Sequence, residues 1–188
     1  MMKKRLTFNA LPKFAHGRNL RQVNSYTWRK IRKALIEEKG CQCECCGAIP
    51  TDQKDQSNFH AHEEWEFDLT NHVLKLQGIN FICKKCHQTE HMGLLELKLS
   101  RGEITQEEYN QVYAHYAKVN GCSLKEAKRD YFKSCWEYKL NPINYDPNLV
   151  QAHWTYELYP ELPFKEEVER KLSEKGLLAP SNNKKDID

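Results

Sequence analysis

The stretch that decides the fold reads Cys43-Glu-Cys-Cys46-Gly47, then His60-Ala-His62, and then Cys83-Lys-Lys-Cys86-His87-Gln-Thr-Glu-His91. The two sulfurs of a Cys-x2-Cys pair lie on one tight turn and face the same point, and four thiolates complete the tetrahedral ligand set of one zinc ion. The sequence therefore predicts a structural Zn²⁺ site whose ligands are Cys43, Cys46, Cys83 and Cys86. The histidines are surplus to this site and must have a role of their own.

The first cysteine pair lies in the run Cys41-Gln-Cys-Glu-Cys-Cys-Gly47, which offers other registers. Cys43 and Cys46 are the only cysteines of this run with two residues between them, and Gly47 follows where a knuckle needs a residue that tolerates positive φ. We interpret the remaining thiols as ordinary reduced cysteines: Cys41, Cys45, Cys122 and Cys135. The N-terminus, Met1-Met2-Lys3-Lys4-Arg5, lacks the apolar region of a secretory signal, so we expect a reducing, cytoplasmic compartment and no disulfides.

Positive charge is concentrated at the start of the chain. The whole sequence has a formal net charge of +3, but residues 1–39 hold eleven lysines and arginines and only two glutamates. A basic segment beside a metal site favours a polyanionic partner, although a solvated helix face would carry the same charges. No apolar run is long enough to span a membrane, so we expect no membrane partner. The side chains expected to contact nucleic acid are Arg29, Lys30, Arg32, Lys33, Lys84 and Lys85.

Periodicity and capping signals predict an α+β fold in which one β-hairpin is embedded in a mainly helical domain. A helix over 25–39 has Ser25 as its N-cap and ends at Gly40, and a polar loop follows over 50–58. The hairpin arms are 59–67 and 73–77, residues 78–82 lead into the second cysteine pair, and a helix over 84–99 comes next. Further helices are expected over 105–119 and 123–138, each with a capping box, and over 149–157 and 164–175.

The chain is long enough for one modest core and a small metal-pinned unit, because it has 188 residues of which 39% are hydrophobic. We divide it into four parts. These are a basic N-terminal segment (1–24), a zinc-knuckle domain (25–100), a helical extension (101–179) and a mobile tail (180–188).

The histidines indicate a second metal site. His87 and His91 are four residues apart in a predicted helix, so their imidazoles share one face at a chelating distance. A third donor from the hairpin would leave positions open for water or phosphate, and a further histidine beside the metal can act as a general base at neutral pH. Two alternatives stay open: His60 lies on the outer face of its strand, or His87 replaces a cysteine in the zinc site.

This pattern resembles the HNH (His-Me finger, ββα-metal) endonuclease family, in the subgroup with two Cys-x2-Cys zinc knuckles. The resemblance covers roughly residues 18–100. It implies a ββα-metal finger framed by the four-cysteine site and a catalytic Mg²⁺, Mn²⁺ or other divalent cation. It also implies that His62 is the general base that activates water and that His87 and His91 are metal ligands.

Two positions depart from the family pattern. Ala61 stands where most members have a metal-binding residue, so the third ligand is His60, Glu63, Asp68 or water, with His60 taken first. Gly78 stands where the family has an asparagine, and Asn71 and Asn80 are out of register. Two hypotheses follow.

The first hypothesis is a metal-dependent endonuclease that nicks DNA, with RNA as another substrate, in phage defence or a mobile element. It would act alone, as a homodimer or with a partner subunit. The second is a catalytically weakened, zinc-stabilised nucleic-acid-binding or adaptor module.

Overall fold

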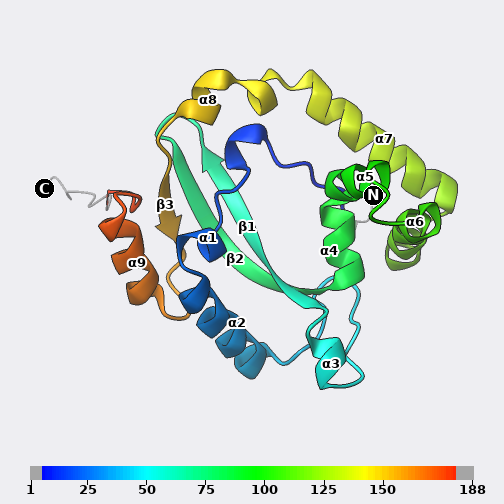
Figure 1. The fold of residues 1–188 in the computed structure, drawn as a ribbon, viewed down its shortest axis with the longest axis horizontal. Coiled ribbons are helices and arrows are strands. Elements are labelled where there is room, and N and C mark those ends of the chain that lie inside the picture. Colours follow the sequence, from blue (N-terminus) through cyan, green and yellow to red (C-terminus); the bar gives the residue numbers. More distant parts are fainter. Residues whose placement is uncertain (1–5, 181–188) are drawn as a thin grey trace, which may run out of the picture.

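The computed structural model describes residues 6–180 and shows a mixed α+β fold. A three-stranded sheet, in the order β1-β2-β3, crosses the centre, with α2 and α9 on one side and α4 to α7 on the other (Figure 1). The N-terminal half contains η1 (Lys13–Ala15), α1 (Leu20–Val23), α2 (Ser25–Lys39), α3 (Gln53–Gln56), β1 (Phe59–Asp68), β2 (Val73–Cys83) and α4 (Lys84–Glu90). The C-terminal half contains α5 (Met92–Ser100), α6 (Gln106–Asn120), α7 (Leu124–Leu140), η2 (Pro142–Tyr145), α8 (Pro147–Gln151), β3 (Thr155–Leu158) and α9 (Lys165–Glu174). The predicted mobile tail lies, apart from Pro180, outside the described residues.

The predicted hairpin is confirmed, and its second strand is longer than expected, because β2 continues beyond Gln77 to Cys83. β1 and β2 pair antiparallel, with Phe59 opposite Cys83 and His62 opposite Asn80, and the register shifts at a bulge after Glu64. Because side chains alternate between the faces of a strand, His60 and His62 lie on the same face of β1. The end of β2 at Cys83 leads directly into α4, so the hairpin delivers its histidines next to this helix.

Two hydrophobic clusters support the two ends of the hairpin. One joins the N-terminal segment to α4, α5, α6 and α7, and in it Phe8 stacks on Tyr116 with ring centroids 4.3 Å apart. The other joins η1, α1, α2, β2, β3 and α9, and in it Phe14 stacks on Trp154 at 4.7 Å. Both clusters therefore cross the segment boundaries that the sequence suggests.

Several helix predictions are confirmed and others are wrong. Thr105 and Ser123 form the predicted capping boxes of α6 and α7. The N-cap of α2 is Asn24 rather than Ser25, because the Asn24 side chain accepts hydrogen bonds from the backbone N–H groups of Tyr26 and Thr27. The predicted helix over 84–99 breaks at His91, which leaves helical geometry with φ −113° and ψ 39°.

The chain after α7 also differs from the prediction. The expected helix over 149–157 is wrong: α8 ends at Gln151, and Thr155–Leu158 forms β3, parallel to the start of β2. Tyr156 and Leu158 are buried against the sheet, so pairing with a strand far away in the sequence overrides the local signal. The polar loop over 50–58 contains the short helix α3, which begins at an Asp52 cap.

Candidate metal centres and nucleic-acid cleft

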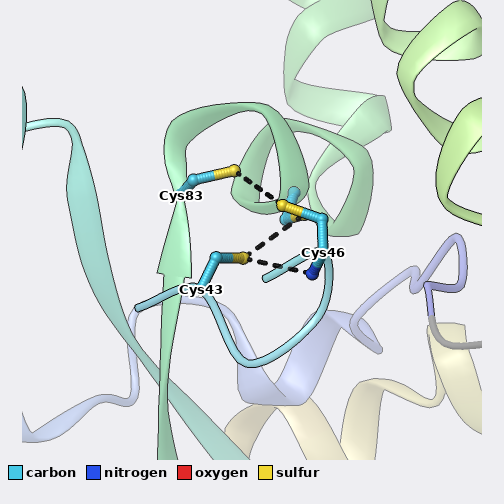
Figure 2. A group of neighbouring side chains, drawn as sticks. Cys43, Cys46 and Cys83 are labelled. Atoms are coloured by element: carbon cyan, nitrogen blue, oxygen red, sulfur yellow. Dashed lines mark hydrogen bonds between the residues drawn. The ribbon is translucent and has the colours of Figure 1, made fainter. Parts of the chain in front are cut away.

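The four predicted zinc ligands come together at one point. Cys43 and Cys46 come from the loop between α2 and α3, Cys83 ends β2, and Cys86 lies in the first turn of α4 (Figure 2). The Sγ atoms are 3.6 Å apart for Cys43 and Cys86 and 3.7 Å apart for Cys46 and Cys83. Tetrahedral Zn–S bonds of about 2.3 Å place sulfurs roughly 3.8 Å apart. The donor set therefore fits a metal ion such as Zn²⁺.

Backbone hydrogen bonds build this knuckle. Gly47 has φ 75°, as expected, and its N–H donates to the Cys43 carbonyl at 2.8 Å. The N–H of Glu44 donates to the Phe81 carbonyl at 2.9 Å, and the Phe81 N–H donates back to the Glu44 carboxylate at 2.7 Å. These two bonds attach the knuckle to β2 and so bring the first cysteine pair to the second.

Two residues that sequence reasoning did not assign to this centre also touch it. His115, on α6, has its Nε2 atom 3.1 Å from Cys86 Sγ. The other is Cys45, predicted to be an ordinary thiol, whose pKa is raised mainly by the neighbouring Cys43 thiol. No local signal identifies His115, because it is 29 residues from Cys86 and meets it only through the packing of α6 on α4.

A second centre lies beside the first, at the other end of α4. The ligating atoms of His62, His87 and His91 lie within 4.8 Å of one another. The ring centroids are 5.6 Å apart for His62 and His87, 5.3 Å for His62 and His91, and 4.5 Å for His87 and His91. β1 supplies His62, α4 supplies His87, and the C-cap of α4 is His91. The three rings surround a position that a metal ion could occupy.

His60 lies next to this group of three but outside it. Its ring stacks on His87 with centroids 4.4 Å apart and an interplanar angle of 4°. The sequence predicts His60 as the first choice for third ligand and His62 as the general base. The structure places His62 with His87 and His91 instead, because the docking of α4 brings both helix histidines toward the second of the two strand positions.

Burial keeps these imidazoles neutral at pH 7. It lowers the pKa of His62 to about 4 and that of His87 to about 3, with neighbouring histidines adding to the effect. The pKa values of His60 and His91 are also lowered, mainly by burial. A neutral imidazole has a free lone pair, so each ring can bind a metal or accept a proton.

The other candidates for third ligand are engaged elsewhere. Glu63 points to the opposite face of β1, where its carboxylate accepts hydrogen bonds from Leu20 N at 2.8 Å and Trp65 Nε1 at 3.1 Å. Burial raises its pKa to about 7. Asp68 lies at the far end of the hairpin and accepts from Asn71 N at 3.0 Å. Neither carboxylate belongs to the histidine group.

A cleft of about 1160 Å³ leads to the histidines. It runs between the N-terminal segment, α2 and β1, and four arginines line it: Arg18, Arg21, Arg29 and Arg32. Four glutamates line it as well, Glu44, Glu63, Glu64 and Glu90, and burial raises the pKa of Glu90 to about 7. The cleft therefore joins the second centre to walls that carry both arginines and glutamates.

Not all the predicted phosphate contacts face this cleft. Arg29 lines it, and Arg32 lines it while its Nη2 donates to the carbonyls of Gln56 and Phe59. Lys30 turns away and pairs with Glu167 of α9, and the exposed Lys33 is 3.6 Å from Glu37. Lys84 and Lys85 are exposed at the start of α4. Arg21, which is outside the predicted set, is exposed in the cleft wall.

Comparison of the chain with protein-family models, curated proteins and solved structures found no match. Within residues 6–180, no helix is both long and apolar enough to cross a membrane. The function of the chain must therefore be inferred from the geometry of the two centres and the cleft.

Proposed function

We propose that this chain is a metal-dependent endonuclease that hydrolyses phosphodiester bonds in DNA. One observation carries the proposal: three neutral imidazoles from a β-hairpin and the helix after it converge at a cleft lined with arginines. A hairpin, a metal position and a helix in this order are the elements of the ββα-metal finger that the sequence resembles. The neighbouring four-cysteine centre supports that resemblance.

The donor set indicates which metals fit the second centre. His62, His87 and His91 are the ligands in this proposal. Imidazole nitrogen suits Zn²⁺, Mn²⁺, Co²⁺ or Ni²⁺ better than Mg²⁺, which prefers oxygen ligands. Three protein ligands leave coordination positions for water and a phosphate oxygen. A divalent ion bound there would polarise the scissile phosphate and offset the charge that develops during hydrolysis.

The remaining side chains then have distinct tasks. His60 is the general base in this proposal, because it is neutral, lines the cleft and lies against the ligand His87 without joining the ligand group. A ring nitrogen of His60 would accept the proton of the attacking water. Arg21 and Arg29 would bind phosphates of the strand and hold it in the cleft, giving affinity without sequence choice.

Nicking of supercoiled plasmid tests the proposal. Wild-type protein with its structural zinc should nick the plasmid when Mn²⁺, Co²⁺ or Ni²⁺ is added and should not do so in excess EDTA. His91→Ala should lower the rate by at least ~100-fold. His153→Ala is the matched control, since His153 is exposed and bonded to the Gly176 carbonyl away from the cleft. A wild-type protein that binds DNA but nicks it with none of these metals would favour the binding-module hypothesis.

A further inference from the structure

The outer face of α7 exposes a row of large apolar side chains. Phe132, Trp136 and Leu140 follow one another at four-residue spacing and are 77%, 65% and 64% exposed. The opposite side of the helix is buried in the core through Ala127 and Tyr131. These three side chains therefore do not help to pack α7 on the core, and no other part of residues 6–180 covers them.

The row continues toward the cleft. Ile143 and Tyr145 of η2 are also exposed, and Lys13 Nζ lies 5.0 Å from the centroid of the Tyr145 ring. The residues just before Lys13, Leu11 and Pro12, line the mouth of the cleft. We call the surface formed by Phe132, Trp136, Leu140, Ile143 and Tyr145 the α7–η2 face. Tyr145 therefore connects this face, through Lys13, to the residues that line the cleft.

Charge indicates what this face binds. Five exposed cations lie on the same helix as the aromatic row: Lys125, Lys128, Arg129, Lys133 and Lys139. Lys128 Nζ lies 5.9 Å from the centroid of the Tyr113 ring, so the other four are the ones that can face a ligand of the row. The acidic neighbours are fewer, with Asp130 beside Arg129 and Glu137 beside Lys133. Two copies packed through this face would bring the same cations against one another, which opposes self-association. The face is complementary to an anion that also has flat apolar groups.

We propose that the α7–η2 face binds a single-stranded segment of nucleic acid next to the cleft. Bases would stack on Phe132 and Trp136, and cations of the same helix would contact phosphates. The inference deepens the proposed function, on which it rests for the identity of the polyanion. It implies that the substrate carries unpaired nucleotides beside the strand that enters the cleft.

The spacing of the aromatic side chains supports a single strand over a duplex. Residues four apart on an α-helix are separated by about 6 Å along its axis. Neighbouring bases in a duplex are only about 3.4 Å apart and stack on each other. Bases that stack on both Phe132 and Trp136 must be separated from each other, which unpaired nucleotides permit.

Fluorescence anisotropy tests the proposal with a labelled oligothymidylate of about 30 nucleotides and a duplex of the same length. The full-length, zinc-loaded protein is used, and a gel checks that the oligonucleotide stays intact. Phe132→Ala and Trp136→Ala should each weaken binding of the single strand by about fivefold or more and leave duplex binding nearly unchanged. Leu124→Ala is the matched control, because Leu124 is exposed on the same helix but precedes the row. Circular dichroism should show the same helix content for all four proteins.

Three results would overturn the proposal. The single strand could bind equally well to both aromatic variants and the wild type. Duplex and single-strand affinities could fall by the same factor, which would show that the face does not distinguish unpaired from paired nucleotides. Sedimentation could show a wild-type dimer that Trp136→Ala dissociates with no change in DNA affinity, which would assign the face to a second copy. Plasmid nicking is measured separately, so a chain that stacks single strands but does not nick would retain this inference and lose the proposed activity.

Discussion

The cysteine and histidine centres each take a residue from the short helix α4, Cys86 and His87, yet they differ in how far protein ligands enclose them. The first has four cysteines, two of them buried, and is fixed to β2 by two hydrogen bonds between Glu44 and Phe81. The second has three half-buried imidazoles that open into a cleft. Structural zinc sites are closed by four protein ligands, whereas catalytic sites keep a position for water. Under the proposed function, the cysteine centre therefore supplies stability and the histidine centre supplies the chemistry.

Removing one ligand from each centre tests this difference most directly and should produce the largest effect. Cys86→Ser should lose its tightly bound zinc and the cooperative unfolding transition, because structural zinc contributes about 10–16 kcal/mol in small zinc domains. His91→Ala should keep the zinc and the transition. Metal analysis and thermal unfolding of the two variants check this. If His91→Ala also loses the tightly bound zinc, then His91 contributes to the zinc site and the two centres are not separate.

The next largest effect concerns the division of tasks between His60 and His62. Both variants, His60→Ala and His62→Ala, should lower nicking by at least ~100-fold. Only His62→Ala should also lose the second metal, because His62 and not His60 belongs to the group of three. Absorption spectra of Co²⁺ added to the zinc-loaded protein report this binding. Loss of the second Co²⁺ in His60→Ala, with retention in His62→Ala, would restore the roles predicted from the sequence.

A smaller effect is expected where α6 touches the cysteine centre. His115 Nε2 lies 3.1 Å from Cys86 Sγ, in position to donate a hydrogen bond to the thiolate. Outer-shell partners of metal ligands are worth about 10–100-fold in metal affinity. His115→Ala should weaken zinc by this amount in competition with a chromophoric chelator, and His115→Gln, which keeps an N–H donor, should recover part of it. Equal zinc affinity in all three proteins would reduce this contact to simple packing.

The cysteine centre was predictable because its signals are local. The two-residue gap, Gly47 and the direct passage from β2 into α4 fix the geometry within a few residues. The capping boxes of α6 and α7 were predictable for the same reason. Within each Cys-x2-Cys pair and each capping box the two residues are only three positions apart, so their local geometry needs no knowledge of tertiary packing. The two cysteine pairs then meet because the predicted hairpin lies between them in the sequence.

The details of the histidine centre could not be predicted in this way. Alternation places His60 and His62 on the same strand face, and only the docking of α4 decides which of them meets His87 and His91. The partner of Lys30 was equally hidden, since Glu167 is 137 residues away in the sequence. The parallel strand β3 also depends on a distant partner. Long-range contacts decide these features, and a local pattern does not contain them.

Acid should lower the stability of the fold in part by protonating buried histidines, and the contribution of His62 can be measured separately. The pKa of His62 is about 4 in the folded protein against an ordinary 6.5. The unfolded chain therefore binds more protons as the pH falls below about 6.5, and the folded state loses stability. One such group costs at most about 1.4 kcal/mol per pH unit. Without added catalytic metal, urea unfolding at pH 7 and pH 5.5 should show a larger loss for the wild type than for His62→Gln. Equal losses would show that His62 takes up its proton in the folded protein as readily as in water.

The smallest effect distinguishes the cleft from the outer face of α2 as the path of the nucleic acid. Arg21 and Arg29 line the cleft, whereas Lys30 is paired with Glu167 and Lys33 lies beside Glu37. Each phosphate contact with duplex DNA contributes about 0.9 to the slope of log affinity against log salt, because it releases condensed counterions. Replacing Arg21 and Arg29 with glutamine should flatten the slope by about this amount per residue. Replacing Lys30 and Lys33 with glutamine should leave it nearly unchanged. A flatter slope in the lysine variant alone would return the nucleic acid to the helix face predicted from the sequence and would separate DNA binding from the histidine cleft.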